Sequence, residues 1–209
     1  MPAHRAPQPG AENLSEPMRS RWSPAWFDPN HTLTTADLST VLSAARWAPS
    51  WGNVQPWSFV VLHRGSPAHN EFLQTLTEGN LLWAPNASAL VVAATQIAPN
   101  PDGKGGMAPD YHRYDLGQAV AHLSLQAVAI GLAAHQFAGF DHDTARHLLG
   151  IPDWFAVDVA VALGRHGDPA DLDPEVDAAL LEKDQERPRK RKPLASIVHD
   201  GHWGTRLVD

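Results

Sequence analysis

The chain contains no cysteine among its 209 residues. This lack excludes disulfide bonds, thiolate nucleophiles, and zinc or iron–sulfur sites that depend on cysteine ligands. Any redox chemistry would therefore need a bound cofactor rather than a protein thiol. The 12 histidines include no His-Glu-x-x-His motif, and His199 with His202 is only an isolated pair, so the sequence predicts no metal site.

The chain also lacks a long hydrophobic run and an excess of positive charge. Its most apolar run, residues 87–94, is far shorter than the roughly 20 residues that a membrane-spanning helix needs. A net charge of −7 gives no overall basic field for nucleic acid or anionic lipid, which favours small molecules as partners. Residues 1–17 contain no apolar segment typical of a signal peptide, so we expect a cytoplasmic protein.

The composition predicts one globular domain with a tail at each end. Hydrophobic residues make up 43% of the chain and charged residues 19%, which is enough for a sizeable core. Residues 1–17 hold four prolines and few side chains that could pack, so we expect a disordered N-terminal tail. The domain is predicted to cover residues 18–195, and residues 196–209 form a C-terminal tail.

Hydrophobic periodicity predicts an α+β fold. A threonine cap, Thr34 or Thr35, begins the first helix, and Pro49 stops it. A helix over 115–134 is apolar almost all round and is therefore expected to be buried. The predicted helices cover 35–47, 68–76, 115–134 and 143–149, and the predicted strands cover 57–63, 88–96 and 155–164.

The stretch from Ala48 to Trp57 joins a helix to a strand through residues suited to a binding loop. Ser50 and Asn53 offer a hydroxyl and an amide, and Gly52 can adopt positive φ. On the residues alone, a helix–strand connection with turn residues and core tryptophans explains the stretch equally well.

The pattern Ala-Pro-Ser-x-x-Asn-x-Gln-Pro-Trp closely resembles the flavin loop of the nitroreductase family of FMN-dependent oxidoreductases. The resemblance implies an α+β fold with an antiparallel or mixed sheet flanked by helices. It also implies an intertwined homodimer with FMN at the interface. Pro49, Ser50 and Asn53 would then contact the FMN held mainly by the other subunit. Trp51 stands where relatives often have a second small residue, which puts a large aromatic side chain in the substrate pocket.

Two basic segments resemble the phosphate side of that family's FMN site. The first implies phosphate-side roles for Arg21 and Ser23, and it has Ala25 where a cation is usual. The second, near the C-terminal end, implies the same role for Arg189 and Arg191. Taken alone, residues 187–192 are equally typical of a solvated tail or a nucleic-acid-binding patch.

Two further segments resemble the part of the family's site that contacts the flavin ring. Asn80 could cap a helix, but the resemblance implies that its side chain binds the pyrimidine edge, with Trp83 in the substrate pocket where some relatives have lysine. In the segment that ends in Gly-Phe-Asp, the resemblance implies that backbone groups of Gln136, Ala138 and Gly139 line the flavin, with an amide directed at N5.

The function implied by the resemblance is FMN-dependent hydride transfer. NADH or NADPH would reduce the flavin at N5, and a nitroaromatic, quinone or similar flat acceptor would then be reduced in a ping-pong cycle, with no catalytic protein side chain. The loss of cations at Ala25 and Trp83 predicts a lowered flavin potential. An alternative is a flavin-binding or flavin-handling protein of the same fold without reductase turnover. Neither reading predicts a nucleic-acid or membrane partner.

Overall fold

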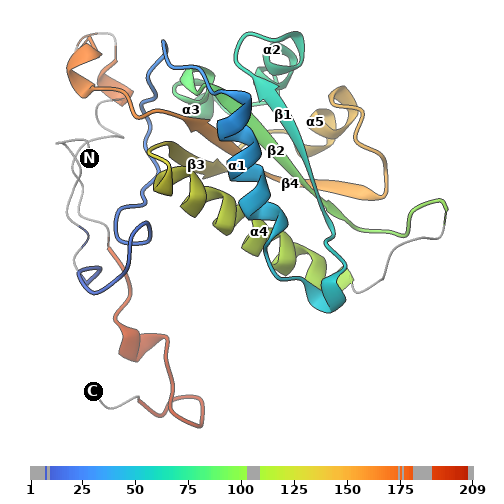
Figure 1. The fold of residues 1–209 in the computed structure, drawn as a ribbon, viewed down its shortest axis with the longest axis vertical. Coiled ribbons are helices and arrows are strands. Elements are labelled where there is room, and N and C mark those ends of the chain that lie inside the picture. The colour runs from blue at the N-terminus through green and yellow to red at the C-terminus, as the bar shows by residue number, and fades with distance from the viewer. Residues whose placement is uncertain are drawn as a thin grey trace.

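A four-stranded antiparallel sheet forms the centre of the protein (Figure 1). The computed structural model describes residues 8, 10–102, 109–173, 175, 177–180 and 190–206. The strand order is β1-β2-β4-β3, and the strands are β1 (Trp57–His63), β2 (Ala89–Gln96), β3 (Ala133–Phe137) and β4 (Phe155–Gly164). The α+β class and the three predicted strands are confirmed.

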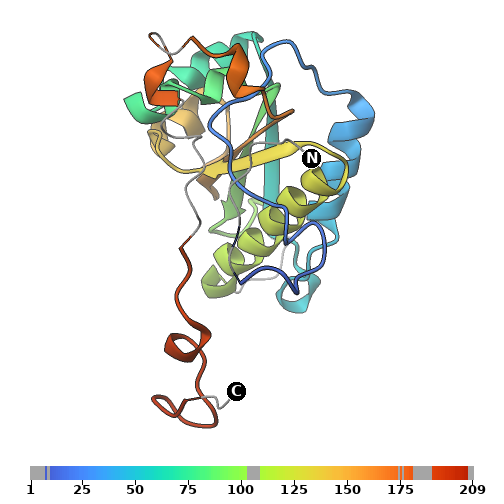
Figure 2. The same ribbon diagram turned by 90° about the vertical axis from the view of Figure 1, so that its left-hand side faces the viewer.

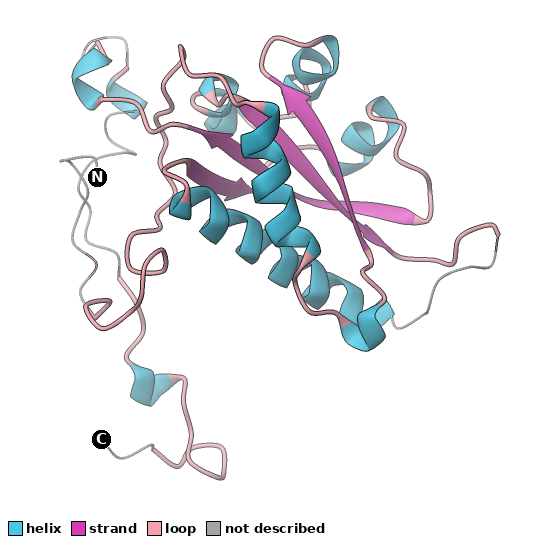
Figure 3. Cartoon of the chain, viewed as in Figure 1, coloured by secondary structure: helices cyan, strands magenta, loops and turns pink. Residues whose placement is uncertain are grey.

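Helices cover both faces of this sheet (Figure 3). The long helices α1 and α4 lie on one face, and the short helices α2, α3 and α5 lie on the other. The helices are α1 (Thr35–Arg46), α2 (Pro67–Leu73), α3 (Glu78–Leu81), α4 (Pro109–Ala129) and α5 (His142–Leu148). Short 3₁₀ turns occur at Trp51–Asn53, Ala84–Asn86, Pro169–Asp171 and Leu194–Ser196.

Strand β2 lies inside the sheet, between β1 and β4, and every one of its residues is buried. It pairs with β1 on one side and β4 on the other, so its backbone donors and acceptors are used in two ladders. Its β-branched and alanine side chains suit a strand that is covered on both faces. The prediction of a central strand from this composition is confirmed.

Helix α1 begins and ends where the sequence predicts. The side chain of Thr34 accepts a hydrogen bond from the Asp37 amide at 3.1 Å, and the Asp37 carboxylate accepts one from the Thr34 amide at 2.9 Å. This reciprocal pair satisfies two backbone donors that the first turn leaves without helical partners. Trp47 follows the last helical residue, two positions before Pro49.

The prediction of a single helix over 115–134 is wrong at its C-terminal end. Helix α4 begins earlier, at Pro109, and ends at Ala129, because Gly131 turns the chain at φ 80°. The next residues form edge strand β3, whose Ala133 pairs with Gly164 of β4. A continuous alanine-rich apolar run does not distinguish a helix from a buried strand by its periodicity.

The prediction that this helix is buried all round is also wrong for the single chain. One face of α4 packs against α1 and the sheet, while Tyr114, Gly117, Ala121 and Ala129 on other faces are exposed. None of the helices in the described part of the chain is long and apolar enough to cross a bilayer.

The two end segments of the chain lie on the same side of the sheet body (Figures 1 and 2). The side chain of Gln8 donates hydrogen bonds to the carbonyl oxygens of Arg19 and Arg21, which holds it against the next segment. Residues 190–206 extend away from the body as an arm that exposes Leu194 and Trp203.

Candidate functional site

A pair of arginines lies where the two end segments approach each other. The Arg21 guanidinium donates a hydrogen bond to the Ser23 hydroxyl at 3.3 Å. Burial is the main cause that lowers the pKa of Arg21, and the positive charge of Arg191 lowers it further. Like charges that influence each other raise each other's energy, so this pair favours a nearby anion. Arg21, Ser23 and Arg191, predicted to act together, are thus brought into one neighbourhood.

A hydrogen bond from His135 ties this N-terminal segment to edge strand β3. Nδ1 of His135 lies 2.7 Å from the Pro24 carbonyl oxygen, which can only accept, so Nδ1 carries the hydrogen. The indole of Trp83 stacks on the His135 ring, with the two ring centroids 4.0 Å apart. The contact links the arginine segment to the segment that carries Asn80.

Asn80 holds the backbone segment that follows β3. Its side-chain amide donates to the Gly139 carbonyl oxygen at 3.0 Å, and its Oδ1 accepts from the Trp83 indole at 3.2 Å. The Thr77 amide donates to the same Gly139 carbonyl at 3.0 Å. Both lone pairs of this carbonyl are therefore used, which fixes the orientation of the Gly139–Phe140 peptide.

The packing at Gly139 leaves no room for a side chain. A Cβ at this position would lie 2.5 Å from Nδ2 of Asn80 and 2.9 Å from Oγ1 of Thr77. Within the described residues, the amides of Ala138 and Gly139 donate to no protein acceptor. Two adjacent free donors on a clamped, partly exposed backbone are suited to bind acceptor atoms of a ligand.

The loop at residues 49–55 forms a second polar group. Asn53 and Gln55 both adopt positive φ, at 58° and 54°. The Ser50 hydroxyl accepts a hydrogen bond from the Gln55 amide at 3.0 Å, and the Gln55 side chain donates to Oδ1 of Asn53 at 3.2 Å. Positive φ at two non-glycine residues costs conformational energy, and such strain is concentrated at functional sites.

Helix α4 anchors this loop through a buried carboxylate. Asp115 is 2% exposed, and its Oδ2 accepts a hydrogen bond from the Trp51 amide at 3.0 Å. The Trp51 ring is parallel to that of Tyr111, with an interplanar angle of 6° and centroids 6.5 Å apart. Both rings are about half exposed, so together they present an aromatic surface to solvent.

The two polar groups lie at opposite ends of a single chain. The 49–55 loop is beside the N-terminal turns of α4, whereas α3 and the end of β3 lie at the other end of the sheet in both views (Figures 1 and 2). One chain therefore does not bring Ser50 and Asn53 to Asn80 and Gly139.

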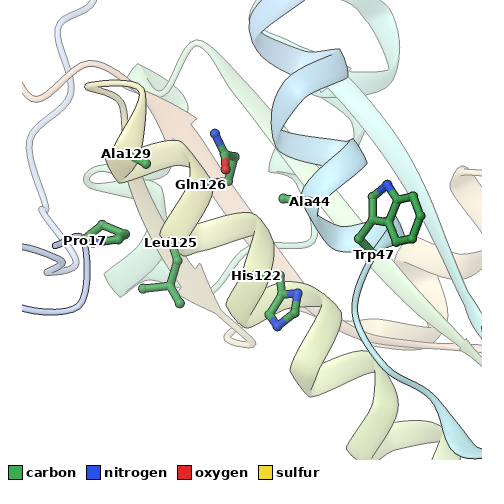
Figure 4. Close-up of a pocket in the computed structure, with 7 residues that line it drawn as sticks. All are labelled: Pro17, Ala44, Trp47, His122, Leu125, Gln126 and Ala129. Atoms are coloured by element: carbon green, nitrogen blue, oxygen red, sulfur yellow. The ribbon is translucent and has the colours of Figure 1, made fainter. Parts of the chain in front are cut away.

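The surface between α1 and α4 is hollowed and apolar (Figure 4). The hollow has a volume of about 360 Å³ and is lined by Pro17, Ala44, Trp47, His122, Leu125, Gln126 and Ala129. Trp47 is 78% exposed on its rim, and a second hollow beside it is lined in part by Asn53 and Gln55 of the loop. An exposed tryptophan over an apolar hollow is typical of a protein interface.

Comparison with known proteins shows the family of this chain. Residues 18–165 match the Nitroreductase family. The chain belongs to the nitroreductase family. It is 36% identical to a solved structure described as an oxidoreductase containing FMN, with a TM-score of 0.77 over 89% of this chain and 90% of the other.

Two relatives with curated names match over most of their length. An uncharacterised 15.4 kDa protein (ask 5′ region) of Mycolicibacterium smegmatis is 35% identical over 68% of this chain and 92% of its own. A protein of Archaeoglobus fulgidus, provisionally named an NADH dehydrogenase/NAD(P)H nitroreductase, is 31% identical over 67% of this chain and 78% of its own.

Some predicted positions differ from expectation. Trp83, predicted in the substrate pocket, is 2% exposed and packs in the core against Phe27 and Phe137, where it orients Asn80. Ala25, where the resemblance implies that a cation is usual, is 4% exposed in the same core, so a lysine there would have to place its ammonium group among apolar side chains.

Two further predicted site residues are Gln136 and Arg189. Gln136 lies in β3, and its side chain donates to the Ser124 hydroxyl of α4 at 2.8 Å. Arg189 lies outside the described residues. In the described ranges, no three or more His, Asp or Glu side chains are grouped to hold a metal ion.

Sequence reasoning missed His135 and His142. Both donate to backbone carbonyls beside the candidate site, His135 to Pro24 and His142 to the segment after β3. The sequence carried one signal for them, because each lies within seven residues of the Gly-Phe-Asp segment. A histidine at a family motif does not by itself show which carbonyl it contacts.

The clamp on Gly139 predicts a measurable coupling between two positions. Gly139→Ala should displace the Asn80 amide and lower the free energy of unfolding by about 1–3 kcal/mol. Asn80→Ala should cost a similar amount, and the double variant should cost clearly less than the sum, since both changes remove the same hydrogen bond. Denaturant unfolding at one protein concentration measures all three.

The matched control is Gly117→Ala in α4. No atom lies within 4 Å of a Cβ at Gly117. This change should leave stability unaltered or raise it by up to about 1 kcal/mol. Additive losses at Asn80 and Gly139 would contradict the contact.

Proposed function

We propose that this nitroreductase-family chain is an FMN-dependent oxidoreductase that acts as a homodimer. The observation that carries the proposal is the tie between two segments. Arg21, which contacts Ser23 and is influenced by the charge of Arg191, lies in the segment that His135 of β3 holds through Pro24. The clamped backbone of Ala138 and Gly139 follows the same strand. The FMN content of a solved relative that is 36% identical supports the proposal.

The arginine cluster suits the phosphate of FMN. Arg21 has no carboxylate partner among the described residues, and burial and Arg191 both lower its pKa. A phosphate would supply the missing negative charge and accept hydrogen bonds from the guanidinium groups and from Ser23. Arg189, for which the sequence predicts the same role, lies two residues before Arg191 in the basic segment 187–192.

The clamped backbone suits the flavin ring. An oxidised isoalloxazine presents N5 and the carbonyl oxygen O4 side by side on one edge, and both accept hydrogen bonds. The amides of Ala138 and Gly139 can donate to them, and the Asn80 side chain lies next to this segment. When bound, FMN would supply hydride exchange between a nicotinamide and an acceptor, so the protein needs only to bind, orient and shield it.

A second copy of the chain completes the site. Pro49, Ser50 and Asn53 lie at the other end of each chain from its own Asn80 and Gly139, and the surface between them is the hollowed face of α1 and α4. A two-fold dimer through this face would cover Trp47 and bring each loop to the partner's clamped backbone. The half-exposed Trp51 and Tyr111 rings would then form part of an apolar wall for a flat acceptor.

The purified protein tests the oxidoreductase proposal directly. We expect a yellow protein with about one FMN per chain. Anaerobic mixing with NADH or NADPH should bleach the flavin absorbance, and a quinone or nitroaromatic should then restore it. Bound FMN that neither reductant bleaches would instead favour a flavin-handling protein without turnover. A colourless protein that does not take up added FMN would refute both.

The phosphate assignment predicts the effect of one charge. Arg21→Ala should weaken FMN binding by about 10- to 100-fold, since a charge-assisted hydrogen bond contributes about 1.5–3 kcal/mol. Lys190→Ala is the matched control, because it removes one positive charge from the exposed segment beside Arg191. Titration of the apo-protein, followed by quenching of flavin fluorescence, gives both constants.

Riboflavin separates the phosphate contacts from the ring contacts. It should bind the wild-type protein far more weakly than FMN does, and Arg21→Ala should not weaken it further. Equal affinity for the two flavins would place the phosphate elsewhere.

The dimer assignment predicts the effect of a charge at the hollowed face. Trp47→Asp should raise the dimer dissociation constant by about 30-fold or more, which corresponds to about 2 kcal/mol, and FMN content should fall with it. Leu148→Asp on α5 is the control, because Leu148 is also exposed but lies on the opposite face of the sheet. Sedimentation velocity over a range of concentrations measures the dimer, and a monomeric wild type with full FMN content would contradict the assignment.

A further inference from the structure

His142, the first residue of α5, lies between two backbone carbonyl oxygens. Its Nδ1 is 2.8 Å from the oxygen of Val157 in β4, and its Nε2 is 3.0 Å from the oxygen of Ala138. Both distances are those of hydrogen bonds. The ring therefore bridges the sheet to the segment that follows β3.

Two carbonyl acceptors require two N–H donors. A neutral imidazole has one donor and one acceptor nitrogen, whereas the imidazolium form has two donors. In the neutral form, one ring lone pair would face a carbonyl lone pair at about 3 Å, which is repulsive. The observed bridge is therefore fully satisfied only by the charged ring.

The surroundings of the ring accommodate a positive charge. The Phe140 ring stacks on His142 with centroids 4.3 Å apart and an interplanar angle of 20°, a contact that favours a cation. Hydrogen bonds from Thr144 are the main cause that holds the pKa of the neighbouring Asp141 below its ordinary value, so this carboxylate is ionised at neutral pH.

The other titratable groups around α5 are paired, exposed or neutral. Asp158 of β4 is paired with Arg113, and Arg146 of α5 with Asp153. His69 of α2 is buried, and burial lowers its pKa, which keeps it neutral. The remaining charged or titratable side chains on α5, α2 and α3 are exposed: Asp143, His147, Glu71 and Glu78.

The carbonyl that His142 contacts belongs to the Ala138–Gly139 peptide group, whose N–H is a candidate donor to the flavin. The Ala138 carbonyl and the Gly139 amide are two ends of one peptide unit, so a charged donor at the oxygen increases the donor strength of the N–H. The Ala138 oxygen also accepts from the Phe140 amide at 3.0 Å. The next carbonyl along, that of Gly139, is held by Thr77 and Asn80.

We propose that His142, in its imidazolium form, is a positioning residue that fixes and polarises the Ala138–Gly139 peptide toward the flavin. The inference rests on the proposed function in one respect, the direction of the Gly139 amide toward N5 of FMN. His142 does not touch the flavin itself. It strengthens the hydrogen bond that the backbone donates, and deprotonation of the ring weakens that bond.

The bridge can be tested in the apo-protein, without FMN. In NMR spectra of the ¹⁵N-labelled chain, the Gly139 amide should shift with pH at the same midpoint as the His142 ring nitrogens. His142→Ala should abolish this shift, and His147→Ala should retain it, since that residue is exposed on the same helix. A Gly139 amide that does not follow the His142 ring would overturn the proposal whether or not FMN binds.

The effect on the cofactor is tested with FMN and 5-deaza-FMN. The second compound carries C–H in place of N5 and therefore has no acceptor at that position. His142→Ala should weaken oxidised FMN three- to tenfold and leave the affinity for 5-deaza-FMN unchanged, with His147→Ala as the control for both. Equal losses for the two flavins would show a merely structural role and overturn the proposal.

The pH profile gives an independent readout. Wild-type affinity for FMN should fall as the pH rises through the titration of His142, and the difference between wild type and His142→Ala removes the contribution of the FMN phosphate. His142→Arg, which keeps a charged donor, should retain the affinity and lose this component. Identical profiles for wild type and His142→Ala would contradict the role of the charge, whereas absence of all FMN binding would instead refute the proposed function.

Discussion

The antiparallel pairing of β2 with β4 is the constraint on which the rest of the fold depends. Both strands are buried along most of their length, and β2 is buried throughout. A strand with two apolar faces needs a covering layer on each side. The long helices α1 and α4 cover one face and the short helices cover the other, which creates two separate cores. The polar segments are consequently left to the ends of the sheet.

That placement explains why the two polar groups assigned to the proposed FMN site do not meet within one chain. The 49–55 loop is fixed to the N-terminal turns of α4 by Asp115, and the Asn80 clamp is fixed to the end of β3. The hollowed face of α1 and α4 lies between copies in the proposed dimer. The small and apolar residues that α4 exposes there are consistent with close packing of a second chain.

Backbone groups rather than side chains form much of the candidate flavin contact. Gly139 must be glycine because Asn80 and Thr77 occupy the space of a Cβ. Around it, His135, Asn80 and His142 each donate to a carbonyl, and each thereby sets the direction of a neighbouring peptide. Such a site tolerates variation in the side chains that point away from the ligand, while the residues that hold the backbone are constrained by geometry.

Local chemistry in the sequence determined the boundaries of α1, the loop after Pro49 and the central strand β2. These features depend on neighbouring residues: a capping box, a proline and a β-branched run. Only the tertiary structure decided that residues 133–137 form a strand, that Trp83 and Ala25 are buried, and that one side of α4 is exposed. Each of these depends on partners far away in the chain. An apolar run does not specify whether sheet, helix or a second copy will cover it.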